Sequence, residues 1–538
     1  MNTTIGDVEL STFNTAYKNL HPSAVSLFDY APSKAGIKER HAALLKKSFK
    51  REELAEALFS FNKQFLYSEK AIEAIERLKD KEASVVVGGQ QAGLLTGPML
   101  VISKALSIIT QAEELQKTTG SPVLPVFWIA GEDHDWLEIN HVWVPGEHGP
   151  VKVRYKGYKK DQLPASEQKL PSKDLSAFIS EVFKHLEETE HSASLLRTVN
   201  QLAERSASVS MFFGECMRWL FKDTDLILLD ANDEQIRALE KDVFANIIAD
   251  NYKIRTALAE GEKNRKDAGF SSVEGINTKS SHLFYHLPHR ELLFPLPDGG
   301  MESKSGHVFS RDLLMKSVQA EPFPFSSNVV TRPLTQETLL PVLAFIGGPG
   351  EVNYWSLLKP VFHALDCDMP PVLLRQHLTI IDKRVQKTLK NENISAGSGA
   401  SGELQRRLEN IINSPAFREG QTAAQSMIEE IKPMHQELAQ NWKEKRPAEK
   451  SFAENNWQRI QNEIFALANR IDSVEKEKAG RRLRNLEASL QLLQPKGIPQ
   501  ERVYSIFWLL NLHGPEIVND MSESLQTSTE PFQHYIEL

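Results

Sequence analysis

Short apolar runs alternate with helical patterns through the first two-thirds of the chain. Residues 84–87 (SVVV) are a β-type run that ends in two glycines, and a helical pattern follows from Pro98 to Lys117. A second apolar run extends from Val123 to Ala130. A strand, a glycine turn, a helix and a second strand make one βαβ unit, and such units form parallel sheets buried on both faces. The pattern therefore predicts an α/β core.

Three later apolar runs extend this predicted sheet. They span residues 226–230 (LILLD), 343–346 (LAFI) and 371–374 (PVLL). Residues 281–309 contain short apolar segments around a PDGG turn, so we expect β-hairpins there. Residues 145–223 have shorter apolar runs and denser charge, which indicates an inserted, mainly helical subdomain.

Long helical patterns dominate both ends of the chain. Residues 31–81 are charged and helical in period, and the chain after Asp382 is polar and helical apart from a break at residues 397–402. Two apolar stripes in this last part step by three or four residues, as heptad seams do. Pro447 lies between them, so we expect an antiparallel helical hairpin. We expect the stripes to form a homodimer, although an internal helical bundle is the alternative. The stripes are Met427, Ile431, Met434, Leu438 and Trp442, and Trp457, Ile460, Ile464, Leu467, Ile471 and Val474.

Composition narrows the class of protein. The 538 residues include 41% hydrophobic and 25% charged residues, and 63 Lys and Arg against 71 Asp and Glu leave a net charge of -8. This balance is typical of a globular protein and argues against a nucleic-acid or anionic-membrane function. Two isolated cysteines, Cys216 and Cys367, fit a reducing compartment. No signal peptide is visible, and no run approaches the roughly 18 residues of a spanning helix. We therefore expect a soluble cytoplasmic enzyme.

The first candidate binding segment is GGQQAGLLTGP, residues 88–98, which joins the first strand to the first helix. Ligands of open α/β sheets bind beyond the carboxyl ends of the strands, and glycines let them approach the backbone. The segment is neither GxGxxG nor a P-loop, so it does not specify ATP, and a turn without a ligand is the alternative. Thr96 is a candidate cap of the helix. The candidate residues are Gly88, Gly89, Gln90, Gln91, Thr96 and Gly97.

The second segment is WIAGEDHDWLEINH, residues 128–141, which follows the second strand. Consecutive ionisable residues beside a buried strand are costly unless they are exposed, paired or used. A histidine between carboxylates suits proton transfer, so Asp133, His134 and Asp135 are the candidate catalytic residues. We predict no metal, because no familiar ligand spacing is present. A solvated acidic loop and a divalent metal site stay open as alternatives, the latter formed by His134, Asp135, Glu138 and His141.

The third segment, GGPGEVNYW (residues 347–355), repeats the strand, glycine turn and helix start. Just upstream, SSNVVTRP contains Arg332, whose planar guanidinium matches two carboxylate oxygens. A surface ion pair is the alternative for this arginine. MESKS, residues 301–305, resembles the KMSKS loop of class I aminoacyl-tRNA synthetases, but we interpret it as ordinary loop chemistry. The candidate binding residues are Asn328, Arg332, Gly347, Gly348, Glu351 and Tyr354.

Several long motifs in order resemble the bacillithiol biosynthesis cysteine-adding enzymes over essentially the whole chain. They are GGQQAGLLTGP, PVFWIAGEDHDWLEI, NVVTRPLTQETLLPVLAFIGGPGEVNYW and the closing PQERV…NLHGPEIV. The resemblance implies a Rossmann-like α/β core with connecting-peptide insertions, as in class I synthetases, plus a C-terminal antiparallel coiled coil. It also implies the last step of the pathway, in which a ligase joins cysteine to the amine of glucosamine-malate.

The class I analogy implies that ATP activates the cysteine carboxyl as an adenylate. The residues themselves leave the activator open, because no HIGH sequence follows the first strand and MESKS matches the lysine loop imperfectly. A metal-dependent hydrolase and a non-catalytic coiled-coil interaction protein are the alternative functions. We expect an N-terminal helical segment (1–82), a first core half (83–145), the helical insertion (146–223), a second core half with β-hairpins (224–383), the coiled-coil hairpin (384–495) and a C-terminal helical segment packed on the core (496–538).

Overall fold

The computed structural model describes residues 2–6, 10–147, 149–157, 163–287, 289–414, 419–445, 450–526 and 533–538. Two compact units divide the chain. The first comprises Met1–Thr379 with Gln500–Ile536, and the second comprises Ile380–Pro499 with Glu537–Leu538. No helix within the described ranges combines the length and the apolar composition needed to cross a bilayer.

The first unit is built on a five-stranded parallel sheet. Its order is β13 (Val372–Leu374), β12 (Val342–Gly347), β2 (Ser84–Gln90), β3 (Val123–Ile129) and β6 (Ile227–Asp230). Every residue of β3, β6 and β12 is buried, as a strand covered on both faces requires. The predicted parallel sheet and its five strands are confirmed.

Helix α6 (Leu100–Thr119) makes the crossover between β2 and β3 and packs on both strands. It is buried from Val101 to Ala112, and it ends at Gly120, whose φ of 75° lies in the left-handed region that glycine favours. The expected cap at Thr96 is wrong: Met99 occupies the N-cap position without a side-chain cap. Thr96 instead belongs to a preceding 3₁₀ turn, η1 (Leu94–Thr96).

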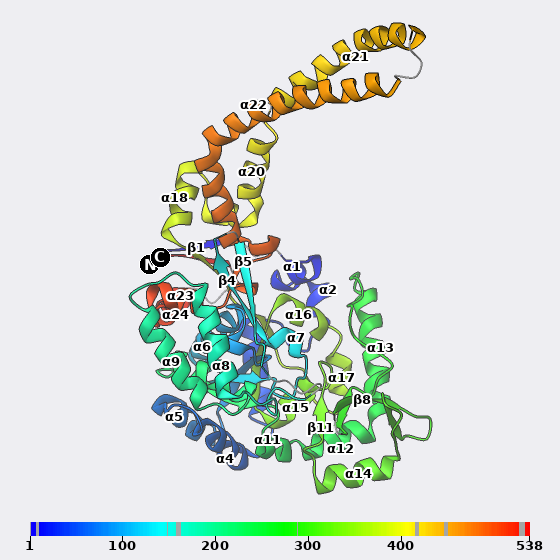
Figure 1. Ribbon diagram of the computed structural model, residues 1–538. Helices are drawn as coiled ribbons and strands as arrows, with labels where there is room; N and C mark the ends of the chain where they lie inside the picture. Colours follow the sequence, from blue (N-terminus) through cyan, green and yellow to red (C-terminus); the bar gives the residue numbers. More distant parts are fainter. Residues whose placement is uncertain are drawn as a thin grey trace. The chain divides into compact units, whose positions relative to one another are not determined.

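Strand β2 lies between β3 and β12, so the chain leaves it in one direction toward β3 and returns on its other side. In open parallel sheets such a switch point opens a crevice at the carboxyl ends of the strands. Helices lie around the sheet (Figure 1). Those that contact its strands include α3 (Lys34–Leu44), α4 (Arg51–Asn62), α5 (Glu69–Arg77) and α16 (Pro349–Trp355). The same unit contains α1 (Thr12–Lys18), α2 (Pro22–Val25), α15 (Arg332–Leu339) and α17 (Lys359–His363).

Two insertions follow the core strands. After β3, the short helix α7 (Trp136–Ile139) leads into the antiparallel strands β4 (His141–Gly146) and β5 (Gly149–Arg154). The rest of this insertion is helical, as expected. Its helices are α8 (Ser172–Lys184), α9 (Ser192–Glu204) and α10 (Val209–Leu220).

The second insertion contains the expected β-hairpins. Its antiparallel sheet has the order β10 (Val308–Phe309), β9 (Met301–Ser303), β8 (Arg290–Pro295), β7 (Leu283–His286) and β11 (Phe325–Ser327). The helices of this region are α11 (Glu234–Leu239), α12 (Lys241–Ala249), α13 (Asn251–Asp267) and α14 (Arg311–Ala320). The C-terminal segment adds η6 (Gln500–Arg502), α23 (Phe507–His513) and α24 (Ile517–Gln526), and β1 (Asn2–Gly6), β15 (Gln533–Glu537) and β14 (His377–Ile381) form a three-stranded sheet.

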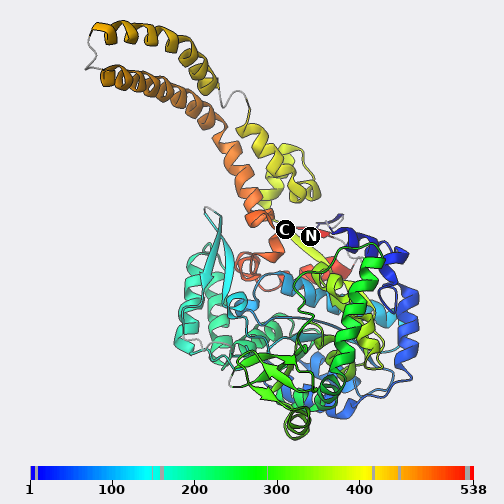
Figure 2. The same ribbon diagram turned by 90° about the vertical axis from the view of Figure 1, so that its right-hand side faces the viewer.

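The second unit is helical and includes the predicted coiled-coil hairpin. Helices α21 (Glu419–Lys445) and α22 (Lys450–Leu493) pack side by side along their length (Figure 2). Pro447, which we expected in the turn, lies outside the described residues. The base of α22 packs on α18 (Lys383–Glu392) and α20 (Leu404–Ile412), and Arg482 forms an ion pair of 2.8 Å with Glu392. The short α19 (Ala396–Ser398) and a π-turn at Gly399–Glu403 lie between α18 and α20.

Small residues make much of the buried face between α21 and α22. Ala424 and Ile428 of α21 are buried, as are Ala453 and Ala468 of α22. By contrast, part of each apolar stripe that we identified points outward. Exposed members are Met427, Met434, Leu438 and Trp442 on α21 and Leu467 and Ile471 on α22.

Candidate active site

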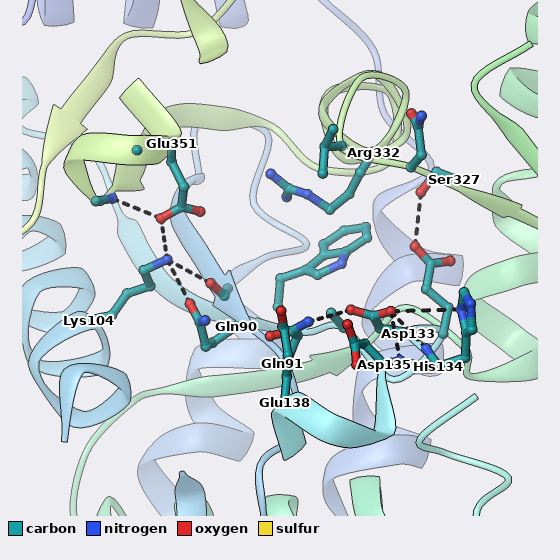
Figure 3. A pocket seen from close by; sticks show the side chains of 18 of the residues that line it. Gln90, Gln91, Lys104, Asp133, His134, Asp135, Glu138, Ser327, Arg332 and Glu351 are labelled. Atoms are coloured by element: carbon teal, nitrogen blue, oxygen red, sulfur yellow. Dashed lines mark hydrogen bonds and ion pairs between the residues drawn. The ribbon is translucent and has the colours of Figure 1, made fainter. Parts of the chain in front are cut away.

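A cavity of about 970 Å³ lies at the carboxyl ends of the parallel strands. Its lining comes from the segments that follow β2, β3, β12 and β13, together with β7, β8, α6 and the C-terminal segment. This is the crevice that the switch point at β2 opens. The three motif segments that we selected from the sequence therefore meet in one place (Figure 3).

Gly88 and Gly89 belong to β2 and are needed for close packing rather than for a left-handed backbone. A side chain at Gly89 would overlap the carbonyl oxygen of Trp128 on β3. At Gly88 a Cβ atom would lie 2.9 Å from the carbonyl oxygen of Ile346. The glycines thus let neighbouring strands approach, and Gly89 also lines the cavity.

Lys104 connects the two glycine segments from inside the cavity wall. Its ammonium group donates to the carbonyl oxygen of Gly89 at 2.8 Å, to Gln90 Oε1 at 3.3 Å and to Glu351 Oε2 at 2.5 Å (Figure 3). Glu351 Oε2 also accepts from the backbone N–H of Gly348 at 2.8 Å. Burial lowers the pKa of Lys104, whereas the Glu351 carboxylate raises it. One buried cation therefore fixes the ends of β2 and β12 relative to each other.

Asp133 is held by its own turn and by Gln91. Gln91 Nε2 donates to Asp133 Oδ2 at 2.6 Å, and Asp133 Oδ1 accepts from the backbone N–H groups of His134 at 2.8 Å and Asp135 at 3.4 Å (Figure 3). These donors orient the carboxylate at the end of β3. Asp135 is exposed and caps α7 by accepting from the N–H of Leu137. Asp133 therefore lies in a fixed polar setting, and Asp135 lies at the solvent side.

His134 meets a buried arginine of the second sheet. Arg290 Nη1 lies 3.1 Å from His134 Nδ1, and its guanidinium lies 3.8 Å from the ring centroid of Phe284. Burial lowers the pKa of His134, and the positive charge of Arg290 lowers it further against the opposing effect of Asp133. Because the arginine can only donate, Nδ1 is the acceptor and the imidazole is neutral. Its other ring nitrogen is then the protonated one in the resting state.

Glu132 stabilises the structure behind the cavity rather than contributing a free carboxylate. Arg237 Nη2 donates to Glu132 Oε2 at 2.8 Å, and Ser327 Oγ donates to Glu132 Oε1 at 3.0 Å. Arg237 also pairs with Glu240 at 3.0 Å. These buried contacts tie β3, α11 and β11 together and hold Ser327 at the cavity wall.

The opposite wall is basic. Arg332 donates to Gln336 Oε1 at 2.9 Å and lies 3.5 Å from the hydroxyl of Tyr354. Arg375 is paired with buried Glu501 at 2.7 Å. Across the described ranges neither Arg332 nor the exposed Arg502 forms an ion pair, so both charges are available to an anion. The surface ion pair that was our alternative for Arg332 is therefore absent from the described part.

The cavity consequently has an acidic side and a basic side. Asp133, Asp135 and Glu138 line one, and Arg332 lies opposite them (Figure 3). Arg502 is a further basic residue of the lining. Such an arrangement can orient a zwitterionic or amino-acid-like molecule, with its ammonium toward the carboxylates and its carboxylate toward the arginines.

The structure brings most of the sequence-selected residues into this cavity. Gly88, Thr96, Gly97 and Gly347 are not among its lining residues. The residues that line it are Gly89, Gln90, Gln91, Asp133, His134, Asp135, Asn328, Arg332, Gly348, Glu351 and Tyr354.

Sequence reasoning missed Lys104, Trp128, Arg290, Arg375 and Arg502 as cavity residues. A signal existed for Lys104, because it is the single charge in the apolar stretch from Leu100 to Ile109. Arg502 belongs to the closing PQERV motif, which the family resemblance had marked, whereas no comparable signal marks Arg290 or Arg375.

Two other sequence features do not contribute to the cavity. MESKS forms β9 and its following turn, where Ser305 bonds to Glu291 and His307. Within the described part of the chain, no three His, Cys, Asp or Glu residues gather as a metal site. His141 lies in β4, with Nδ1 3.2 Å from Asn140 Oδ1, and is not a cavity residue.

Comparisons with known proteins agree with this architecture. The protein-family model described as "Bacillithiol biosynthesis BshC, N-terminal Rossmann-like domain" matches residues 2–376. The family model of the BshC C-terminal coiled-coil domain matches residues 378–536. Proteins named "Putative cysteine ligase BshC" from Bacillus cytotoxicus, Halalkalibacterium halodurans and Bacillus pumilus are 34%, 33% and 34% identical to this chain. The matches cover 92%, 93% and 91% of this chain and the same shares of the relatives. The chain therefore belongs to the bacillithiol biosynthesis BshC family.

Proposed function

We propose that this protein is a cysteine ligase that joins the carboxyl group of cysteine to the amine of glucosamine-malate, the last step of bacillithiol biosynthesis. Family membership and the name of the relatives support the reaction. The structural observation that carries it is the cavity at the switch point of the sheet, whose lining combines carboxylates with two arginines that form no ion pair within the described residues. Neither a metal-dependent hydrolase nor a non-catalytic interaction protein is favoured by these observations.

Cysteine carries an amine and a carboxylate, and glucosamine-malate carries an amine and the carboxylates of malate. We place the carboxylates of glucosamine-malate against Arg332 and Arg502, because these guanidinium groups lack an ion-pair partner within the described residues. The amine then lies toward Asp133 and His134. An amine must be neutral to attack a carboxyl carbon, and the fixed Asp133 carboxylate can take its proton. His134 Nδ1 already accepts from Arg290, so its protonated ring nitrogen acts as a hydrogen-bond donor to the substrate.

Amide formation also requires an activated carboxyl group, and we propose ATP as its source. In this scheme the cysteine carboxylate displaces pyrophosphate from the α-phosphorus, and the sugar amine then displaces AMP and loses a proton. The cavity supports anion binding through Arg332 and Arg502, whereas Lys104 and Arg375 already pair with Glu351 and Glu501. Chemically, ATP supplies the leaving group, and the residues of the chain orient the two substrates.

A homodimer through the coiled-coil hairpin is the proposed assembly. The supporting observation is the exposed apolar surface of the hairpin, where Leu438 is 70% and Leu467 is 65% exposed. Exposed apolar residues repeated along a helix favour a partner surface.

Thiol analysis in cells tests the reaction. The gene is introduced into a bacillithiol-producing host that lacks its own family member, and thiols are labelled with monobromobimane and identified by mass spectrometry. We expect bacillithiol to return with the wild-type chain and not with Asp133→Asn, expressed to the same level. Accumulated glucosamine-malate without bacillithiol in the wild-type complemented strain would contradict the proposal. The activation step is tested by incubating the purified enzyme with both substrates and ATP. The products are analysed for AMP, which the adenylate scheme predicts, and for inorganic phosphate.

A further inference from the structure

A second cavity, of about 410 Å³, shares no lining residue with the candidate active site. It is formed by the end of α4, the loop to α5, the start of α5, and α10. None of the motifs that carry the family resemblance contributes to it.

Arg218 of α10 lies at its base and is 1% exposed. Its Nη2 donates to Asn62 Oδ1 at 2.7 Å, and no carboxylate of the described residues lies within 4.0 Å of its guanidinium. Glu215, three residues earlier, accepts instead from Arg205 at 2.7 Å. Burial lowers the pKa of Arg218 to about 10 against the opposing effect of the Glu215 carboxylate, so the side chain is still charged at neutral pH. A buried guanidinium without a directly paired carboxylate is costly and favours the binding of an anion.

The walls above Arg218 are aromatic and apolar. Phe65 and Ala71 are buried, whereas Phe59 is 40% and Tyr67 is 79% exposed at the mouth. The ammonium group of Lys63 lies 5.8 Å from the ring centroid of Phe59 and adds a second positive charge near the opening. The cavity thus combines a cation at its base with a mouth of aromatic rings.

We propose that this cavity is a binding site for a small carboxylate that carries an aromatic or branched apolar group. The carboxylate accepts two hydrogen bonds from the planar guanidinium of Arg218, which stabilises its charge. The apolar group lies against Phe65 and Ala71, with Tyr67 and Phe59 covering it at the mouth. The volume is within the usual range of small-molecule sites, about 300 to 1,000 Å³. The site is separate from the ligase reaction and does not depend on it.

Calorimetric titration of the full chain with sodium phenylacetate tests this site, with phenylacetamide as the neutral ligand of the same shape. We expect saturable binding of phenylacetate and affinity weaker by about tenfold or more for phenylacetamide. In Arg218→Met the affinity for phenylacetate falls by about the same factor, because the charge is gone. Arg218→Lys keeps the positive charge but not the planar pair of donors, so its affinity for phenylacetate should lie between those of the wild type and Arg218→Met. Inorganic phosphate has no apolar group to lie against the apolar walls, so we expect it to bind more weakly than phenylacetate.

The basic wall of the active site is a competing place for phenylacetate, so Arg332→Gln is the matched control. Binding that survives in Arg332→Gln and is lost in Arg218→Met supports the proposal. Absence of binding to the wild type, unchanged affinity in folded Arg218→Met, or loss only in Arg332→Gln overturns it. Ile72→Trp fills the cavity from its half-buried wall and gives a second test if Arg218→Met does not fold. Unchanged phenylacetate affinity in folded Ile72→Trp also overturns the proposal.

Discussion

Replacing Lys104 with methionine keeps most of the side-chain volume and removes the charge that holds three oxygen atoms. The Lys104 side chain is 2% exposed and that of Glu351 is 26% exposed. Removing one partner of a buried ion pair costs about 3 to 5 kcal/mol. Glu351 keeps some contact with water and one backbone N–H donor, so we expect a smaller loss of stability, about 2 to 3 kcal/mol.

A double-mutant cycle with Glu351→Gln isolates this interaction. If the loss of the ion pair is the cause, the double variant Lys104→Met with Glu351→Gln should be only about 1 kcal/mol less stable than the wild type, because no unpaired charge is left. Urea unfolding gives the free energies of unfolding of the variants. Hydrogen exchange of peptides from β2 and α16 then shows whether the loss of stability is located in this part of the molecule. Turnover of Lys104→Met should fall by about a hundredfold, since Gln90 and Glu351 lose their common donor.

The reasoning about Lys104 is refuted if the single variant unfolds at the wild-type urea concentration with unchanged turnover. It is also refuted if the double variant is as unstable as the sum of the two singles. Thr110→Val is the matched control for a polar-to-apolar change on the same helix. Among the described residues the buried Thr110 hydroxyl has no hydrogen-bond partner, and Thr110 lines no part of the cavity, so this variant should retain turnover.

Three further predictions concern the chemistry and the assembly. Asp133→Asn and His134→Ala should each abolish product formation in the thiol assay while the melting temperature stays near that of the wild type; near-normal turnover in both would remove these residues from catalysis. Because burial and Arg290 lower the pKa of His134, the midpoint of the acid limb in a plot of kcat against pH should lie below the ordinary histidine pKa of about 6.5. Arg290→Gln should raise that midpoint, and an unmoved limb would contradict the assignment. Leu467→Asp with Ile471→Asp places charge on the exposed stripe and should convert a dimer into a folded monomer by light scattering, whereas an unchanged mass would exclude this seam.

The amino-acid sequence by itself determined the elements of the core and their type. Strands of this sheet contain continuous apolar runs, such as residues 85–87 and 123–129, because both faces of a parallel sheet are buried, and this pattern is local. The rule that ligands bind beyond the carboxyl ends of such strands then selected Gln91, Asp133 and Glu351, which do line one cavity. These predictions needed only periodicity and strand polarity.

Tertiary structure alone decided which partners meet at that cavity. Arg290 comes from a segment far from the motifs, and Arg502 belongs to the closing PQERV motif, for which the sequence indicated no place in the cavity. A charged residue at a strand start or a turn has no local pattern that distinguishes it from a solvated one. The role of Gly89 was also a tertiary fact, because the constraint is the approach of Trp128 from the next strand and not the conformation of its own backbone. For the same reason the heptad pattern predicted the hairpin but not which members of each stripe face outward. Small residues such as Ala424 and Ala468 let the two helices pack closely and leave Leu438 and Leu467 exposed.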